Sequence, residues 1–163
     1  MKIIVISDTH IPSAGDKLPD KLVEVIRSAD MVLHAGDFAS REFYEELNGM
    51  CNLQAVAGNM DEDNLISILP RNRVVEILGR RIGLIHGAGS SKHTFQYVQN
   101  VFRDKNVDAV VFGHTHHPFN EMNNGILFFN PGSPLDNRWA PYHSYGILDV
   151  TDEGISGKIV KID

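Results

Sequence analysis

Two histidines with one residue between them follow a run of small apolar residues in the second half of the chain. They are His114 and His116, and Gly113 precedes them. In extended backbone, residues two positions apart project to the same side, so both imidazoles can reach one site. Four other clusters of the same character come earlier, each after a short apolar run: Asp8-Thr9-His10, Gly36-Asp37, Gly58-Asn59 and His86-Gly87. Together the five clusters offer seven nitrogen or oxygen ligands, enough for two metal ions.

The donor types limit both the metal and the reaction. With oxygen and imidazole donors only, the expected ions are Mn²⁺, Fe²⁺, Co²⁺, Ni²⁺ or Zn²⁺. Asp37 can bridge two cations, because one carboxylate can bind both of them. Two ions about 3.5–4 Å apart can clamp the attacking and leaving oxygens of a displacement, and they lower the pKa of bound water toward ~7. Asn59 adds a neutral ligand and an amide donor for a phosphoryl oxygen, so Asp37 and Asn59 are the candidate catalytic residues.

Each cluster taken alone has an ordinary structural alternative. Asp8 could cap a helix, and Gly-Asp and Gly-Asn pairs are common in turns. Five such clusters in this order, each after an apolar run, favour a common metal site instead.

The elements that must carry these clusters alternate regularly in the first half of the chain. Apolar runs predict buried strands over 3–6, 31–34 and 53–57, and amphipathic patterns predict helices over 19–29 and 40–48. This β-α-β-α-β order predicts parallel strands with crossover helices. Because sites in α/β sheets lie beyond the carboxyl ends of the strands, we expect the clusters to converge on one edge.

The second half of the chain is richer in strands. A helix is predicted over 91–104, and strands are predicted over 73–78, 81–86, 108–112, 119–122, 126–130, 144–150 and 155–162. Two mixed sheets stacked face to face, with helices outside each, account for this pattern better than one open sheet. No repeat or linker is evident, so we expect one α/β domain over residues 1–163.

Composition excludes several classes of function. The net charge of −6 argues against stable binding of nucleic acid, which needs a basic surface. A single cysteine, Cys51, permits neither an intrachain disulfide nor a thiolate metal site. No apolar stretch is long enough to span a membrane, and the first apolar run is too short for a signal peptide. We therefore expect a cytoplasmic protein that does not bind membranes.

The motifs and their order resemble those of the calcineurin-like metallophosphoesterase superfamily, most closely its small, single-domain prokaryotic phosphodiesterase branch. The superfamily pattern is Asp-X-His, Gly-Asp, Gly-Asn-His-Asp/Glu, a lone His, and Gly-His-X-His. The resemblance covers essentially the whole chain and is carried by Asp8-Thr9-His10, Gly36-Asp37, Gly58-Asn59-Met60-Asp61, His86, Gly113-His114-Thr115-His116 and the Asn130-Pro131-Gly132-Ser133 segment typical of the branch. It implies a four-layer α/β/β/α sandwich, in agreement with the two stacked sheets.

The resemblance also implies a ligand set and an activity. The first ion would be held by Asp8, His10, Asp37 and His116, and the second by Asp37, Asn59, His86 and His114. The implied reaction is hydrolysis of a small or nucleotide-like phosphodiester, with Mn²⁺ as the expected ion. A phosphomonoesterase on the same centre is the alternative. A non-catalytic scaffold, as in the retromer coat subunit of eukaryotes that shares this fold, is disfavoured because all seven ligands are present.

The chain departs from the superfamily pattern at Met60. Many members have a histidine there, which protonates the leaving group or contacts the phosphate. A thioether has no proton to transfer, so we expect good turnover of activated aryl esters and weaker turnover of alkyl esters. Asp61 would lack the partner that it normally orients, and we expect it to cap the next turn.

The remaining histidines have weaker signals. His34 is expected to be a buried residue beside the site rather than a ligand, and His117 a surface residue. His93, near a helix start, and His143, in a loop that could fold over the site, are candidate substrate contacts. Arg138 and Trp139 in the same loop as His143 are further candidates. An exposed edge strand could pair with a second copy, so a homo-oligomer stays open.

Overall fold

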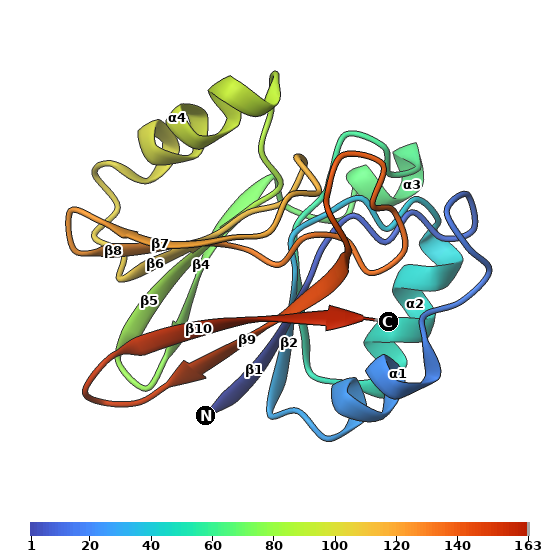
Figure 1. Ribbon diagram of the computed structural model, residues 1–163, viewed down its shortest axis with the longest axis horizontal. Helices are drawn as coiled ribbons and strands as arrows, with labels where there is room; N and C mark the ends of the chain where they lie inside the picture. Colours follow the sequence, from blue (N-terminus) through green and yellow to red (C-terminus); the bar gives the residue numbers. More distant parts are fainter. Residues whose placement is uncertain (163) are drawn as a thin grey trace.

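Two five-stranded mixed sheets pack face to face in the computed structural model, which describes residues 1–162 (Figure 1). The first sheet has the order β10-β9-β1-β2-β3, with β1 (Lys2–Ile6), β2 (Met31–His34), β3 (Leu53–Ala55), β9 (His143–Val150) and β10 (Ile155–Ile162). The second sheet has the order β4-β5-β6-β8-β7, with β4 (Asn72–Ile77), β5 (Arg80–Ile85), β6 (Ala109–Val111), β7 (Phe119–Asn123) and β8 (Ile126–Asn130).

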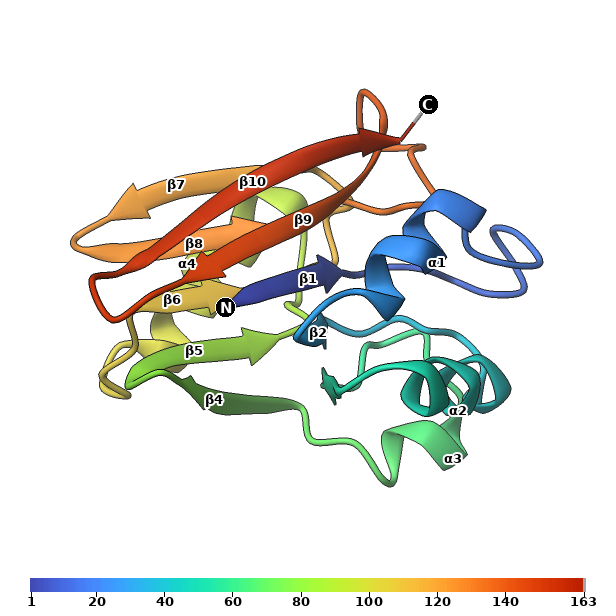
Figure 2. The same cartoon turned by 90° about the horizontal axis from the view of Figure 1, so that it is seen from below.

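Each sheet contains a set of three parallel strands. β1, β2 and β3 are parallel neighbours in the first sheet, and β5, β6 and β8 are parallel neighbours in the second. The other pairings are antiparallel. β1 and β5 point to the same side of the molecule (Figure 2). The carboxyl ends of both parallel sets therefore open onto one rim.

Helices cover the outer face of each sheet and complete four layers. α1 (Asp20–Arg27), α2 (Arg41–Met50) and the short α3 (Asp63–Ile66) contribute to an apolar cluster on the outer face of the first sheet. α4 (Ser91–Phe102) packs on the second sheet through a separate cluster. The expected α/β/β/α sandwich is confirmed.

β1 shows why its sequence is a continuous apolar run. Ile3 and Val5 are buried between the sheets, in a cluster with Leu84 and Phe129 of the second sheet. Ile4 and Ile6, on the alternate face, are buried under the helices. Alternate side chains of a strand point to opposite faces, so both faces of β1 must be apolar.

The predicted elements match the structure closely, with one omission. The one-turn helix α3 was not predicted, because four residues are too few to show a helical period. Ser40 caps α2, since its side chain accepts a hydrogen bond from the Phe43 amide. Among the described residues, no helix combines the length and the apolar character that crossing a bilayer would require.

Candidate metal centre

The rim loops that follow β1, β2, β3, β5 and β6 carry the five sequence clusters, in that order. These loops converge, as the order of the strands in the two sheets requires. The structure brings together all seven predicted side chains: Asp8, His10, Asp37, Asn59, His86, His114 and His116.

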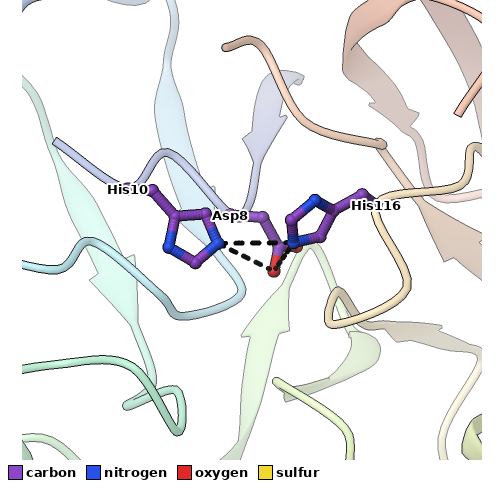
Figure 3. Close-up of side chains that lie close together, drawn as sticks. All are labelled: Asp8, His10 and His116. Atoms are coloured by element: carbon purple, nitrogen blue, oxygen red, sulfur yellow. Dashed lines mark hydrogen bonds and ion pairs between the residues drawn. The ribbon is translucent and has the colours of Figure 1, made fainter. Parts of the chain in front are cut away.

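Asp8, His10 and His116 form the first group of facing donors (Figure 3). The Asp8 Oδ1 atom lies 3.2 Å from His116 Nε2 and 3.9 Å from His10 Nε2. The two Nε2 atoms are 3.3 Å apart. Three donor atoms that face one another at this spacing can surround a single cation.

Asp37 and His86 form the second group, which Asp8 also adjoins. The Asp37 Oδ2 atom lies 3.2 Å from His86 Nε2 and 3.6 Å from His10 Nε2, so one oxygen faces both groups. Its other oxygen, Oδ1, accepts a hydrogen bond from the Met60 amide at 2.8 Å. The backbone thus holds one Asp37 oxygen and leaves the other between the groups.

Asn59 and His114 extend the second group. Asn59 Oδ1 lies 3.0 Å from His86 Nε2 and 3.2 Å from His114 Nδ1. Hydrogen bonds on the far side set the imidazole tautomers: His86 Nδ1 donates to the Ala35 carbonyl at 2.8 Å, and His114 Nε2 donates to the Gly89 carbonyl at 2.7 Å. When the rings are neutral, His86 Nε2 and His114 Nδ1 therefore face the site as lone pairs, the form that binds a metal.

The carboxylate of Asp8 tests whether these residues suit a cation. Its Oδ2 accepts hydrogen bonds from the Ser7 hydroxyl at 2.6 Å and the His114 amide at 3.1 Å. Its Oδ1 is buried and has no hydrogen-bond partner of good geometry among the described residues. A buried carboxylate oxygen without a partner is costly unless a positive charge faces it. The donor set therefore fits divalent metal ions.

The pKa values of Asp8 and His86 reflect the charges that these two side chains face in the site. Burial alone would raise the pKa of Asp8, but the nearby His86 and His116 and the hydrogen bond from Ser7 lower it to about 2. Burial would lower the pKa of His86, but the carboxylates of Asp8 and Asp37 raise it to about 9. Both shifts show that these carboxylates favour a positive charge beside them, which is either a proton on an imidazole or a bound cation.

The backbone of the rim is held in an unfavourable conformation. Five of the predicted ligands have positive φ angles: Asp8 (53°), His10 (47°), Asp37 (59°), His114 (70°) and His116 (58°). Residues with a side chain rarely adopt this region, and such outliers gather at functional sites. Gly58 has no room for a side chain, because a Cβ there would lie 2.1 Å from Asp37 Oδ1.

Asp61 holds two of these loops together. Its carboxylate accepts hydrogen bonds from the amides of Gly58 at 2.7 Å, Ala39 at 2.9 Å and Asp37 at 3.2 Å. Burial raises the pKa of Asp61, and the amide donors partly offset the effect. The expectation that Asp61 caps the next turn is wrong, because Glu62 is the N-cap of α3. The irregular loops leave amides unpaired, and Asp61 satisfies them.

A cavity of about 680 Å³ lies over the two groups. Met60, which is 61% exposed, lines this cavity at the position where superfamily members have a histidine. Arg138 and Trp139 line it as well. His93 pairs with Ser90 at 2.6 Å, and His143 pairs with Ile162 in the sheet. Neither of these two histidines lines the cavity, so their substrate contacts stay predictions.

Asp136 is a residue at the site that the sequence analysis missed. Its Oδ2 lies 3.6 Å from His116 Nδ1, on the side of the ring away from Asp8. Arg138 donates to both Asp136 oxygens, at 2.9 and 2.6 Å, and this pairing lowers the pKa of the carboxyl. A carboxylate behind a metal-binding histidine orients the ring and makes it a better ligand. The Asp-X-Arg spacing was the only signal in the sequence.

His34 is a buried neighbour of the site and not a member of either group, as expected. Its Nδ1 accepts a hydrogen bond from the Gly36 amide at 3.1 Å, so Nε2 carries the proton and donates to Thr9 Oγ1 at 3.1 Å. The ring stacks on Phe38 with centroids 3.5 Å apart. Burial lowers the pKa of His34 to about 3.

These observations define a class of protein: a four-layer α/β sandwich with a carboxylate, imidazole and amide site for divalent metal at one rim. Residues 1–153 match the family described as the calcineurin-like phosphoesterase superfamily domain. The chain belongs to this superfamily and is a metal-dependent phosphoesterase.

Named relatives agree with this assignment. The chain is 34% identical over 161 residues to a probable metallophosphoesterase of Methanothermobacter thermautotrophicus, covering 99% of this chain and 92% of the relative. It is 30% identical over 148 residues to a phosphodiesterase of Methanocaldococcus jannaschii, covering 81% of this chain and 83% of the relative. The crystal structure of Vps29 from Chaetomium thermophilum has a TM-score of 0.80, covers 98% of this chain and 95% of that one, and is 21% identical, a likeness of fold alone.

The buried His34 predicts a defined dependence of stability on pH. The unfolded imidazole binds a proton below pH ~6.5, whereas the folded one stays neutral down to its pKa of about 3. The unfolded state therefore binds more protons in this window, and the free energy of unfolding falls as the pH drops. Between pH 7 and pH 5, we expect the free energy of unfolding of His34→Asn to fall by about 2 kcal/mol less than that of the parent. Denaturant unfolding in EDTA measures both values.

The control for this measurement is His93→Asn, a change at an exposed histidine that should leave the pH dependence of the parent intact. If the His34→Asn variant and the parent lost the same free energy of unfolding over this range, the buried neutral ring would not be the cause.

The position of Asp136 predicts an effect on metal affinity. Asp136→Ala removes the carboxylate behind His116, and loss of such a partner costs ~10–100-fold in metal affinity. We expect this weakening for Mn²⁺ in isothermal titration calorimetry. Asn137→Ala, in the same cavity wall but without a contact to His116, is the matched control. Equal affinities in the two variants would count against an orienting role for Asp136.

Proposed function

We propose that the chain is a phosphodiesterase whose centre holds two divalent transition-metal ions, with Mn²⁺ as the expected ion. The observation that carries this proposal is the pair of donor groups on either side of Asp37 Oδ2, at 3.6 and 3.2 Å from His10 and His86. One buried oxygen between two sets of imidazoles suits two cations better than one. Asp8 Oδ1, which is buried and has no hydrogen-bond partner among residues 1–162, supports the same interpretation.

The geometry supports the ligand sets that the resemblance implied. The first ion would be held by Asp8, His10, Asp37 and His116, and the second by Asp37, Asn59, His86 and His114. Asp8 adjoins both sets, because its Oδ1 is also 3.8 Å from His86 Nε2. When bound, the ions supply Lewis-acid stabilisation of the phosphoryl oxygens and lower the pKa of a bound water.

The chain's own residues bind and orient the ester. The Asn59 carbonyl oxygen faces the two histidines, which leaves its amide nitrogen as a donor for a phosphoryl oxygen. Met60 lines the cavity and offers no proton to the leaving group. Catalysis therefore favours esters whose leaving group departs as an anion, such as p-nitrophenolate.

The charge of the cavity favours a diester over a monoester. Among the described residues that line it, Arg138 is the one Lys or Arg, and its guanidinium is already paired with Asp136. A diester brings a single negative charge, whereas a monoester at neutral pH brings nearly two. The relative in Methanocaldococcus jannaschii that is named a phosphodiesterase supports this choice.

Hydrolysis of two nitrophenyl esters tests the activity. We expect EDTA-treated protein to be inactive, and Mn²⁺ to restore hydrolysis of bis-p-nitrophenyl phosphate more efficiently than that of p-nitrophenyl phosphate, measured as kcat/KM. Faster hydrolysis of the monoester would make the protein a phosphomonoesterase. If Mn²⁺, Ni²⁺, Co²⁺ and Zn²⁺ all failed to restore any activity, a non-catalytic scaffold would be the better assignment.

Metal counting tests the two-ion centre. We expect about two Mn²⁺ per chain in the parent, measured by elemental analysis after equilibrium dialysis. His86→Ala should lose mainly the second ion, because His86 is proposed as a ligand of that ion alone. Asp37→Asn should weaken both ions together, because its Oδ2 faces both sets. An equal loss of both ions in His86→Ala would contradict this partition of ligands.

A scaffold function has one structural argument, the likeness of fold to Vps29. The complete set of seven donors around a buried, unpaired carboxylate oxygen favours the enzyme. We further propose that residues 1–163 act as one domain on a small phosphoester in the cytoplasm. The homo-oligomer stays a prediction.

A further inference from the structure

A second cavity, of about 280 Å³, lies beside the metal site and has a different character. Its apolar walls are the rings of Phe95, Phe112, Phe119 and Trp139. The centroids of Phe95 and Phe119 are 5.3 Å apart, and those of Phe112 and Phe119 are 6.1 Å apart. We call this cavity the aromatic pocket. Its aromatic walls suit a flat ring.

The aromatic pocket adjoins the metal cavity. Trp139 lines both of them, so it forms part of their common wall. Thr115, which also lines the pocket, lies in the chain between the predicted ligands His114 and His116. A group attached to a phosphorus at the metals can therefore extend into the pocket.

Trp139 is 73% exposed, although tryptophan is among the most apolar side chains. An exposed tryptophan beside an apolar cavity gains contact area when a planar ligand stacks on it. The loop that carries it is tied to the metal site, because Asp136 contacts both His116 and Arg138. Trp139 is thus placed to cover a bound ring.

The edge of the pocket carries one hydrogen-bond acceptor and one hydrogen-bond donor. His117 Nδ1 donates to the Pro118 carbonyl at 3.1 Å, which leaves Nε2 of the neutral ring as an acceptor. Thr115 Oγ1 accepts from Asn130 Nδ2 at 3.1 Å and from the His117 amide at 3.3 Å, which leaves its own proton for donation. One acceptor and one donor beside aromatic walls match the edge of a nucleobase better than a plain phenyl ring.

We propose that the aromatic pocket binds a nucleobase of the substrate, so that the ester cleaved at the metals is a nucleotide derivative. This inference rests on the proposed phosphoesterase site, and it names the organic group that the site selects. Stacking of a base on aromatic side chains strengthens binding by a factor of ~5–150.

Intrinsic fluorescence tests the pocket without relying on turnover, because Trp139 is the only tryptophan in the chain. The ligands are adenosine 5′-monophosphate, phenyl phosphate and ribose 5-phosphate, added to Mn²⁺-loaded protein with excitation at about 295 nm, where the tryptophan absorbs and the base does not. We expect adenosine 5′-monophosphate to change the emission and to bind at least ~10-fold tighter than ribose 5-phosphate. Phenyl phosphate should lie between them.

Two variants test whether the preference for adenosine 5′-monophosphate arises in the aromatic pocket. Phe95→Ala should remove most of the preference for adenosine 5′-monophosphate over ribose 5-phosphate. His117→Ala, at an exposed position that should not affect folding, should bring adenosine 5′-monophosphate down to the affinity of phenyl phosphate. Met122→Ala, an exposed apolar residue on β7 outside the pocket, is the matched control and should bind like the parent.

The outcomes separate this inference from the proposed function. If the protein hydrolyses bis-p-nitrophenyl phosphate but binds adenosine 5′-monophosphate and ribose 5-phosphate equally, the pocket does not bind a base. If phenyl phosphate binds as tightly as adenosine 5′-monophosphate, the hydrogen-bonding edge plays no part and the nucleobase assignment is wrong. A base-dependent fluorescence change in a protein without hydrolytic activity would support the pocket and reject the phosphoesterase.

Discussion

The arrangement of the rim depends on one constraint, the burial of two carboxylates side by side. Asp8 and Asp37 are both almost fully buried, and each has one oxygen fixed by hydrogen bonds and one oxygen turned toward imidazoles. Burying one such charge without a partner costs several kcal/mol, and burying two next to each other costs more. A positive charge at the site offsets this penalty, and the imidazoles that face the carboxylates can supply it as protons or as ligands of a cation.

A site of this kind needs a rigid frame, because the carboxylates repel each other when no cation is present. The two sheets provide it by directing the ends of β1, β2, β3, β5 and β6 onto one rim. Left-handed backbone at five of the predicted ligands then turns each side chain inward. Asp61 ties the loop after β2 to the loop after β3 through three amide hydrogen bonds. The free energy stored in these loops is balanced by packing in the sandwich beneath them.

The sequence was sufficient to predict the strands and the cluster of donors, and the reason is physical. A strand buried on both faces, such as Ile3–Ile6, must be continuously apolar. Its end and the polar residues after it can therefore be recognised in the sequence. Asp136 was missed because its contact with His116 joins residues that the sequence does not relate. Asp61 was misjudged because its partners are backbone amides, which leave no trace in the sequence. Likewise, the aromatic pocket gathers side chains from α4, β7 and two loops, and no local pattern marks such a set.

The loop that precedes β9 contributes to both the metal cavity and the aromatic pocket. Asp136 stands behind His116, Arg138 pairs with Asp136, and Trp139 follows at the common wall of the two cavities. A shift of this loop would therefore change the orientation of a predicted metal ligand and the shape of the aromatic pocket together. Such coupling means that substitutions in the loop act on metal affinity and on ligand preference at once. Substitutions at Arg138 or Trp139 can thus change the walls of the two cavities without any change in the seven donors, because this loop carries none of them.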